Sequence, residues 1–337
     1  MPPKPIIPKP IILDTDIGTD VDDAMALSLA LASPELELVG VTTVHADAPL
    51  RARLARRLLT LAGRSEVPVV AGASFPLADP LPPNFHWMPR LRGHEGVGVL
   101  NEEELRPSTD LYGGADDAAH FIIGQARAYA EQGRRLSIVT IGALTNLARA
   151  LQLEPRLVDW IEGVTLMGGT VYADLFPWPP MLETNFNCDP EATRLVFESG
   201  LPLTLVPMEV TTQVFLTSEQ RARMTSWCAP LSDALVKMME GMLVGMDSLS
   251  AEVGLSEDFY QGRTFMHDPL AVATAFGSPL LTAEPLHVRY EIIDQVVRTM
   301  PHPELESNMR VATAVDAPAF VQFWLDRVEV FSTNPVR

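Results

Sequence analysis

Short apolar runs rich in β-branched residues alternate with longer segments of helical spacing along this sequence. Successive pairs are PIILDTD with DDAMALSLALAS, LELVGVTTV with LRARLARRLLTLAG, and RLSIVTIG with LTNLARALQL. This alternation predicts an α/β fold in which helices cover both faces of an open, mainly parallel sheet. Because ligands of such sheets bind beyond the carboxyl ends of the strands, we expect the active site at that edge.

No linker or change of composition divides the 337 residues. We therefore expect a single domain over residues 11–335, preceded by an extended Pro-rich tail over residues 1–10. The tail lacks the apolar core of a signal peptide, and no apolar stretch reaches the roughly 20 residues that cross a bilayer. The two cysteines, Cys188 and Cys228, indicate no disulfide framework. These features favour a cytoplasmic protein without a membrane partner.

The formal net charge is −18 at pH 7. It argues against a nucleic-acid partner, because no basic stripe is present to neutralise phosphates. The longest basic segment, Leu50–Leu59, alternates Arg with Leu and Ala at helical spacing. We interpret this segment as an amphipathic surface helix in preference to an anion site.

Five aspartates lie within ten residues, between two apolar runs. They are Asp14, Asp16, Asp20, Asp22 and Asp23. Like charges this close raise one another's pKa and destabilise the fold unless a cation lies among them. Carboxylate oxygens without nearby Cys or clustered His indicate a hard cation, Ca²⁺ or Mg²⁺. The alternative is a solvated acidic turn between a strand and a helix.

Polar residues also follow two other predicted strands. His45 and Asp47 follow VGVTTV, and Thr145 and Asn146 follow SIVTIGAL. In a parallel sheet these strand ends lie at one edge, so we expect the four residues to lie near the aspartates.

Four further motifs occur in a characteristic order: GALTNLARAL, LMGGT, ETNFNCDPEATRLVFESGLPLTLVP and FMHDPLAVATA. With the aspartate motif they resemble the inosine-uridine-preferring nucleoside hydrolase family over roughly residues 10 to 330. The resemblance implies Ca²⁺-dependent hydrolysis of the N-glycosidic bond of ribonucleosides, in purine and pyrimidine salvage. It also implies a homodimer or homotetramer with a ribonucleoside as its small-molecule substrate.

The resemblance assigns a role to most of the aspartates. The ion would be held by Asp16, Asp23, the backbone carbonyl of Thr145 and Asp268. Asp16 would also be the catalytic base that activates water, and Asp22 would bind a ribose hydroxyl. These residue types suit an oxocarbenium-like ribosyl transition state, which needs an activated water and nearby negative charge. The first motif is two residues longer than the family's usual form, so Asp20 has no counterpart and is expected to be an exposed turn carboxylate.

By the same resemblance, Glu183 and Asn185 would bind the ribose hydroxyls, and His267 would be catalytic, helping to protonate the leaving base. The residues alone leave structural alternatives open. Glu183 and Asn185 could belong to a capped loop, and Asp189 before Pro190 is expected to be the N-cap of the next helix. His267 could be a histidine of the core.

The sequence departs from the family's pattern at three places. Asp47 stands where a ribose-binding Asn is usual, and a carboxylate can accept a hydrogen bond from a sugar hydroxyl but cannot donate one. Pro177 stands where the family has an Asn for the 5′ end of ribose. Arg92 replaces a histidine, for which His94 is the candidate replacement at the substrate. A loop histidine bonded to the backbone is the equal alternative for His94.

Two Pro-rich stretches, residues 75–89 and 174–183, are candidate loops over the site. Their Trp87 and Trp178 are candidates for stacking on the base, and the alternative is that they pack beneath their own loops.

Three other functions are compatible with parts of this sequence. They are hydrolysis of a modified nucleoside or other N-riboside, non-catalytic metal-dependent binding of a nucleoside or ribose, and phosphotransfer of the haloacid dehalogenase type. The last requires a downstream lysine and a Ser or Thr at a strand end for the phosphate. Lysine is scarce here, and none follows a clear predicted strand.

Overall fold

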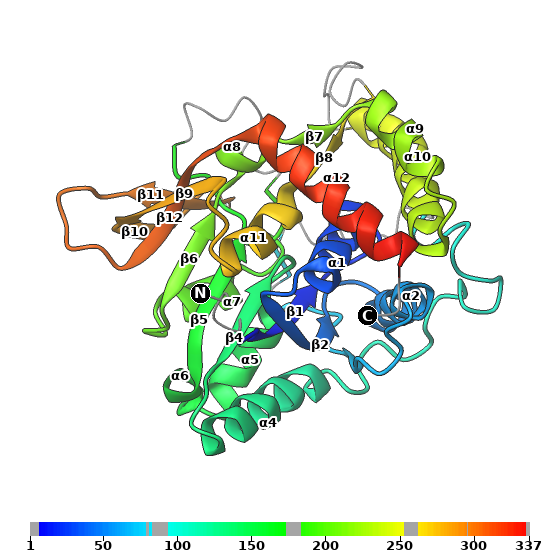
Figure 1. Cartoon of the computed structure of the whole chain (residues 1–337). Helices are drawn as coiled ribbons and strands as arrows, with labels where there is room; N and C mark the ends of the chain where they lie inside the picture. The colour runs from blue at the N-terminus through cyan, green and yellow to red at the C-terminus, as the bar shows by residue number, and fades with distance from the viewer. Residues whose placement is uncertain are drawn as a thin grey trace.

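The computed structural model describes residues 7–78, 81–82, 94–172, 183–252, 262–294 and 296–334. At its centre is an eight-stranded sheet with the order β3-β2-β1-β4-β5-β6-β12-β9 (Figure 1). The strands are β1 (Lys9–Thr15), β2 (Leu36–Thr43), β3 (Val69–Ala71), β4 (Leu136–Thr140), β5 (Ile161–Met167), β6 (Leu203–Val206), β9 (Leu281–Leu286) and β12 (Met309–Val315). All neighbouring pairs are parallel except β12 and β9. The predicted open, mainly parallel α/β sheet is confirmed.

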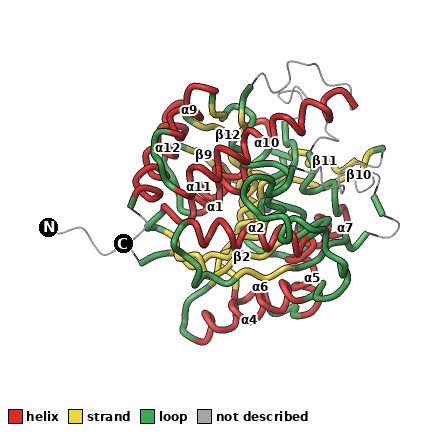
Figure 2. The backbone as a smooth tube through the Cα atoms, turned by 90° about the vertical axis from the view of Figure 1, so that its right-hand side faces the viewer, coloured by secondary structure: helices red, strands yellow, loops and turns green. Residues whose placement is uncertain are grey.

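Helices cover both faces of the sheet (Figure 2). On one face a large hydrophobic cluster joins the sheet to α1 (Asp22–Ala32), α2 (Ala48–Leu61), α9 (Ser218–Thr225), α10 (Pro230–Glu252), α11 (His267–Ala275) and α12 (Ala317–Thr333). On the other face a second cluster joins it to α4 (Asp117–Glu131), α5 (Thr145–Leu153), α6 (Leu157–Trp160) and α7 (Pro190–Phe197). The short α8 (Met208–Thr211) follows β6.

Two small antiparallel ladders stand apart from the main sheet. β10 (Val288–Ile293) pairs with β11 (Val296–Pro301), and β7 (Phe215–Leu216) pairs with β8 (Thr264–Phe265). The second ladder leads directly into α11, whose first residue is His267.

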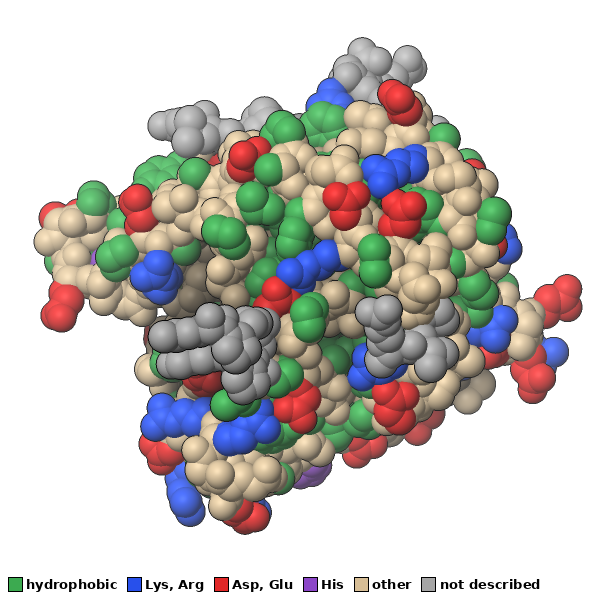
Figure 3. All heavy atoms as spheres, viewed as in Figure 1, with side chains coloured by type: hydrophobic (Ala, Val, Ile, Leu, Met, Phe, Trp, Pro, Cys, Tyr) green, Lys and Arg blue, Asp and Glu red, His purple; other side chains and the backbone are tan. Residues whose placement is uncertain are grey.

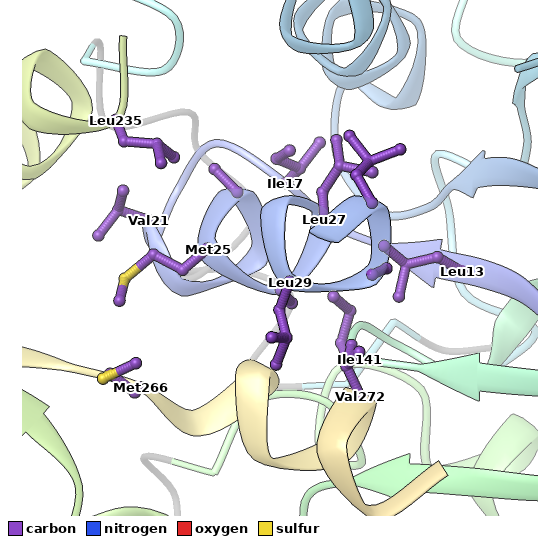
Figure 4. Close-up of a cluster of buried hydrophobic side chains, with 14 of the residues drawn as sticks. Leu13, Ile17, Val21, Met25, Leu27, Leu29, Ile141, Leu235, Met266 and Val272 are labelled. Carbon is purple, nitrogen blue, oxygen red and sulfur yellow. The ribbon is translucent and has the colours of Figure 1, made fainter. Parts of the chain in front are cut away.

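Helix α1 is enclosed by the rest of the chain. Every residue from Asp22 to Leu31 is buried, which suits a helix made almost entirely of Ala, Leu and Met after its first two residues. Side chains from α10 and α11, among them Leu235 and Val272, surround it (Figure 4). This packing fixes the helix and therefore fixes the two aspartates of its first turn.

The connections of the sheet reverse direction between β1 and β4. From β1 the chain proceeds outward to β2 and β3, whereas from β4 it proceeds the opposite way to β5 and β6. Asp14 and Thr140 are register partners at the carboxyl ends of β1 and β4. Such a switch point is where open α/β sheets bind ligands.

Several predictions concern the ends and the surface of the chain. β1 begins at Lys9, inside the predicted tail. Cys188 and Cys228 are free, as expected. On the face in Figure 3, Lys and Arg side chains are scattered among acidic ones, without a basic stripe. No helix in the described part of the chain is long and apolar enough to cross a membrane. Four of the residues singled out in the sequence lie outside the described part of the chain, namely Trp87, Arg92, Pro177 and Trp178.

Candidate active site

Three buried carboxylates converge at the switch point. Asp22 and Asp23 open α1, Asp268 is the second residue of α11, and each of the three is 3% exposed. One oxygen from each lies within 4.8 Å of the others. Two oxygens that bind one Ca²⁺ at about 2.3–2.6 Å can be at most about 5 Å apart. The three carboxylates therefore fit around a single hard cation.

The protein offsets part of this negative charge with helix ends. The positive ends of the dipoles of α1 and α11 meet at the cluster, and the backbone N–H of Asp268 donates to Asp22 Oδ2 at 3.3 Å. Thr15 Oγ1 donates to Asp23 Oδ1. Burial, followed by mutual repulsion, nevertheless raises the pKa of all three carboxyls well above the usual range. A bound cation would allow all three to be ionised together.

Asp16 lies beside this cluster and is half-buried. Its charge is among the causes that raise the pKa of Asp22, Asp23 and Asp268. The turn after β4 approaches it so closely that a Cβ at Gly142 would lie 2.8 Å from the Asp16 nitrogen and 2.9 Å from its Oδ1. Asp16 thus combines proximity to the cluster with access to solvent.

The expectation of an exposed Asp20 is wrong. Asp20 is half-buried, and its Oδ1 accepts a hydrogen bond from the Val21 N–H at 2.7 Å. Burial raises its pKa, and its charge also raises the pKa of Asp22 and Asp268. Asp20 is therefore a fifth carboxylate in this region, after the three of the cluster and Asp16.

Arg51 is the main residue that sequence reasoning missed. It is 1% exposed, and its guanidinium donates to the carbonyl oxygens of Asp16, Ile17 and His45 and to Thr19 Oγ1. The surface-helix interpretation of Leu50–Leu59 is therefore wrong for this residue.

The spacing of Arg51 contained the missing signal. It precedes the buried residues Leu54, Ala55 and Leu58 by three, four and seven positions, which places it on the buried face of α2.

Thr145 begins α5, and its hydroxyl donates to Asp189 Oδ2 at 2.6 Å. Asp189 also accepts a hydrogen bond from the Ala192 N–H at 3.1 Å and so caps α7, as predicted. The side chain of Thr145 is thus engaged in structure, and only its backbone carbonyl is a candidate ligand.

Asp14 and Asn146 tie neighbouring strand ends together. Asn146 Nδ2 donates to Asp14 Oδ1 at 2.8 Å and to the Thr43 carbonyl at 3.1 Å. Asp14 Oδ2 is buried without a hydrogen-bond partner among the described residues, and burial raises the pKa of this carboxyl to about 7.

Glu183 and Asn185 lie at the same edge of the sheet. Asn185 Nδ2 donates to the carbonyl oxygens of Ile141 and Met167, at 3.2 and 3.1 Å, which follow β4 and end β5. Glu183 Oε1 accepts from the Phe186 N–H at 3.1 Å, and burial raises the pKa of Glu183 to about 7. Both residues hold the loop in place while lying at the predicted site.

His267 directly precedes Asp268, so it borders the carboxylate cluster. Its Nδ1 lies 2.7 Å from Thr211 Oγ1, and its ring stacks on Phe265 with centroids 5.5 Å apart. Burial lowers its pKa to about 4, so the imidazole is neutral at pH 7. Thr211 was not singled out by its sequence context.

Two of the expected substrate-binding residues contact the backbone. His94 Nε2 donates to the Thr19 carbonyl at 2.8 Å, which is the alternative considered for this residue. Asp47 caps α2 by accepting from the Leu50 N–H, and its other oxygen accepts from the Ser108 N–H, both at 2.8 Å.

The arrangement combines a buried anionic cluster with a neighbouring carboxylate and an imidazole. Hydrolysis of a bond to a cationic sugar centre requires these elements: negative charge, a base for water, and a group that assists the departing base.

Comparison with known proteins agrees with this chemistry. Residues 11–322 match the family model described as inosine-uridine preferring nucleoside hydrolase. The inosine-uridine preferring nucleoside hydrolase of Leishmania major is 31% identical, with 94% of this chain and 96% of that protein aligned. A pyrimidine-specific ribonucleoside hydrolase of Shewanella sp. (strain ANA-3) is 30% identical, over 96% and 97% of the two chains.

A solved structure agrees in fold as well. The purine-preferring ribonucleoside hydrolase from Gardnerella vaginalis superposes with a TM-score of 0.76 at 28% identity, and covers 96% of this chain and 99% of its own. The resemblance predicted from the motifs is therefore confirmed: the chain belongs to the inosine-uridine preferring nucleoside hydrolase family and is a nucleoside hydrolase.

Proposed function

We propose that this protein hydrolyses the N-glycosidic bond of ribonucleosides in a Ca²⁺-dependent reaction, releasing free base and ribose. The observation that carries the proposal is the convergence of Asp22, Asp23 and Asp268 within 4.8 Å, beside the half-buried Asp16.

The donor set favours a hard cation, because the converging atoms are carboxylate oxygens. Asp22, Asp23 and Asp268 would hold the ion, with Asp16 and the Thr145 carbonyl as the remaining candidate ligands. Asp22 thus joins the ligand set, although the sequence assigned it to a ribose hydroxyl. A bound Ca²⁺ supplies positive charge that orients a water and the ribose hydroxyls and lowers the pKa of that water.

The chain's own residues would divide the remaining work. Asp16 takes a proton from water while the water oxygen bonds to C1′ of the ribose. The electron pair of the broken C1′–N bond leaves with the base, whose nitrogen would accept a hydrogen bond from the neutral His267 ring and take up its proton from water. Glu183 and Asn185, held at the sheet edge, would orient the sugar for attack.

The preferred base is open, since relatives are named as inosine-uridine preferring, pyrimidine-specific and purine-preferring. One observation favours a second candidate substrate class, a modified nucleoside or another N-riboside. Asp47 stands where the family's ribose-binding Asn is expected, and both of its oxygens accept backbone hydrogen bonds. The ribose hydroxyls would therefore find different hydrogen-bonding groups here than in a protein with the usual Asn.

A panel of ribonucleosides and modified ribosides tests the proposal, with released ribose assayed as reducing sugar in Ca²⁺ and in chelator. We expect release from at least one substrate in Ca²⁺ and its loss in chelator. Asp16→Asn should lower turnover by about 10²–10⁴-fold at saturating Ca²⁺, whereas Asp159→Asn at an exposed position should not. Nucleoside binding without ribose release would instead identify a non-catalytic binding protein.

The assembly and location of the protein remain predictions. Light scattering of the purified chain would test the expected homodimer or homotetramer. Ile292 and Ile293 on β10, which are 55% and 43% exposed, offer apolar surface for such an assembly. Cell fractionation would test the cytoplasmic location.

A further inference from the structure

The imidazole of His267 is held from two directions. Thr211 Oγ1 lies 2.7 Å from Nδ1, and the Phe265 ring stacks on the imidazole at 5.5 Å with 25° between the planes. Thr211 is fully buried at the end of α8, on a segment more than fifty residues away in the sequence. The contact therefore links two elements that are far apart in the sequence.

The hydroxyl of Thr211 has two possible acceptors for its single proton. One is His267 Nδ1 at 2.7 Å, and the other is the Met208 carbonyl at 3.3 Å. The shorter contact has the length of a good hydrogen bond, and the longer one is near the limit. The distances thus favour donation from Thr211 to Nδ1, which assigns the ring proton of the neutral imidazole to Nε2.

The other ring nitrogen is available for a ligand. In the part of the chain that the structure describes, His267 Nε2 contacts no hydrogen-bonding group, and the residue is not fully enclosed. Asp268, the next residue, belongs to the carboxylate cluster. A proton on Nε2 would therefore be presented beside the cluster, where the leaving base would be.

We propose that Thr211 is a positioning residue that fixes the orientation and tautomer of His267, so that Nε2–H donates a hydrogen bond to the departing base. This inference rests on the proposed function. A valine at this position would fill nearly the same volume but could not donate to Nδ1. The ring would then be free to place its proton on either nitrogen, and part of the population would present a lone pair to the base.

Thr211→Val tests the role of the hydroxyl, Thr211→Ser restores it, and Thr212→Val is the matched control on the neighbouring threonine. On the best ribonucleoside from the panel, Thr211→Val should lower kcat roughly tenfold with little change in KM, as expected for one lost orienting hydrogen bond. On a 4-nitrophenyl riboside, whose leaving group departs without such help, the loss should be no more than about twofold. Thr211→Ser should recover most of the nucleoside activity, and Thr212→Val should match the wild type.

A double-mutant cycle adds specificity. In a His267→Ala background, Thr211→Val should have no further effect on nucleoside turnover, because the residue acts only through the ring. Equal losses on both substrates, or an undiminished effect of Thr211→Val without the histidine, would overturn the inference.

A second readout does not depend on activity. The ¹⁵N shifts of the His267 ring should show the Nε2–H tautomer in the wild type and a mixture of tautomers in Thr211→Val. An Nδ1–H ring in the wild type would refute the positioning role whatever the enzyme hydrolyses. Conversely, the protein could show the expected tautomers but release ribose from no riboside. That result would refute the proposed function without contradicting the effect of Thr211 on the His267 ring.

Discussion

Replacing Arg51 by methionine tests how the aspartate loop is held. Arg51 is buried, and its guanidinium donates to Ile17 O at 3.0 Å, to His45 O at 2.9 Å, to Thr19 Oγ1 at 3.0 Å and to Asp16 O. Methionine keeps most of the length of the side chain but offers no donor. Arg51→Met therefore leaves three carbonyl oxygens without this partner and removes the positive charge beside the carboxylates.

The cost can be bounded from these contacts. Each buried polar group left unsatisfied costs about 1–3 kcal/mol, and removing one partner of a buried charged network costs about 3–5 kcal/mol. Because the desolvation cost of the guanidinium disappears with it, we expect a net loss of about 3–5 kcal/mol in the free energy of unfolding rather than the sum over all bonds. The loss should be greater in chelator than in Ca²⁺, because the guanidinium lowers the pKa of Asp16 and Asp23 and a bound ion would take over that role.

Denaturant unfolding in chelator and in Ca²⁺ measures both quantities. The matched control is Arg53→Met, two residues further along the same helix, whose guanidinium donates to the carbonyls of Glu104 and Arg106 at 2.8 Å. That variant should lose no more than about 1.5 kcal/mol, equally in both buffers. If Arg51→Met and Arg53→Met lose the same stability, or if the Arg51 loss does not depend on Ca²⁺, the assigned role is refuted.

Three further predictions concern the same edge of the sheet. Gly142→Ala should cost about 1–3 kcal/mol and lower ribose release more than about tenfold by displacing Asp16, whereas Gly124→Ala, with no atom within 4 Å of the added carbon, should not destabilise. Asp268→Asn should leave stability in chelator unchanged or higher, because it removes a repelling charge, and should abolish the rise in melting temperature with Ca²⁺; a retained rise would reject the ion site. The pKa of Glu183 is raised from 4.5 to about 7, so its contribution to stability is present below pH 4.5 and is lost as the pH rises through about 7. Unfolding of Glu183→Gln in chelator should therefore show a smaller decline with pH than the wild type, by on the order of 1–3 kcal/mol, and identical slopes would contradict the pKa shift.

The fold was predictable because its signal is local and repeated. Each buried strand is a run of β-branched residues, and each covering helix has its own apolar pattern, so the type of sheet follows from their alternation. The antiparallel edge strand β9 was not predicted. Its sequence, LTAEPL, carries Pro285 and Glu284, which suit an edge strand but resemble a loop.

The site was predictable only in part. Asp22, Asp23 and Asp268 stand at helix starts, and the family resemblance predicted that Asp16, Asp23 and Asp268 converge. Thr211 gave no such signal, because its contact runs to a ring nitrogen 56 residues away in the sequence. The helical spacing of Arg51 indicated that it is buried, but not the carbonyl oxygens to which it donates. Contacts of this kind depend on the three-dimensional arrangement of loops, which periodicity does not encode.

The loop of the first motif is held by side chains from two other parts of the chain. The extended loop passes through Thr19, whose carbonyl accepts from His94 and whose hydroxyl accepts from Arg51. A longer loop has more backbone freedom. Without restraint, the first turn of α1 would vary in position, and with it the carboxylates of Asp22 and Asp23. His94 therefore restrains this loop, and its role at the substrate in place of the histidine that Arg92 replaces stays a prediction. We therefore expect the rise in melting temperature with Ca²⁺ to be smaller in His94→Ala than in the wild type, although all three carboxylates are intact. The physical reason is that the substitution disorders the loop and leaves the ligands themselves unchanged.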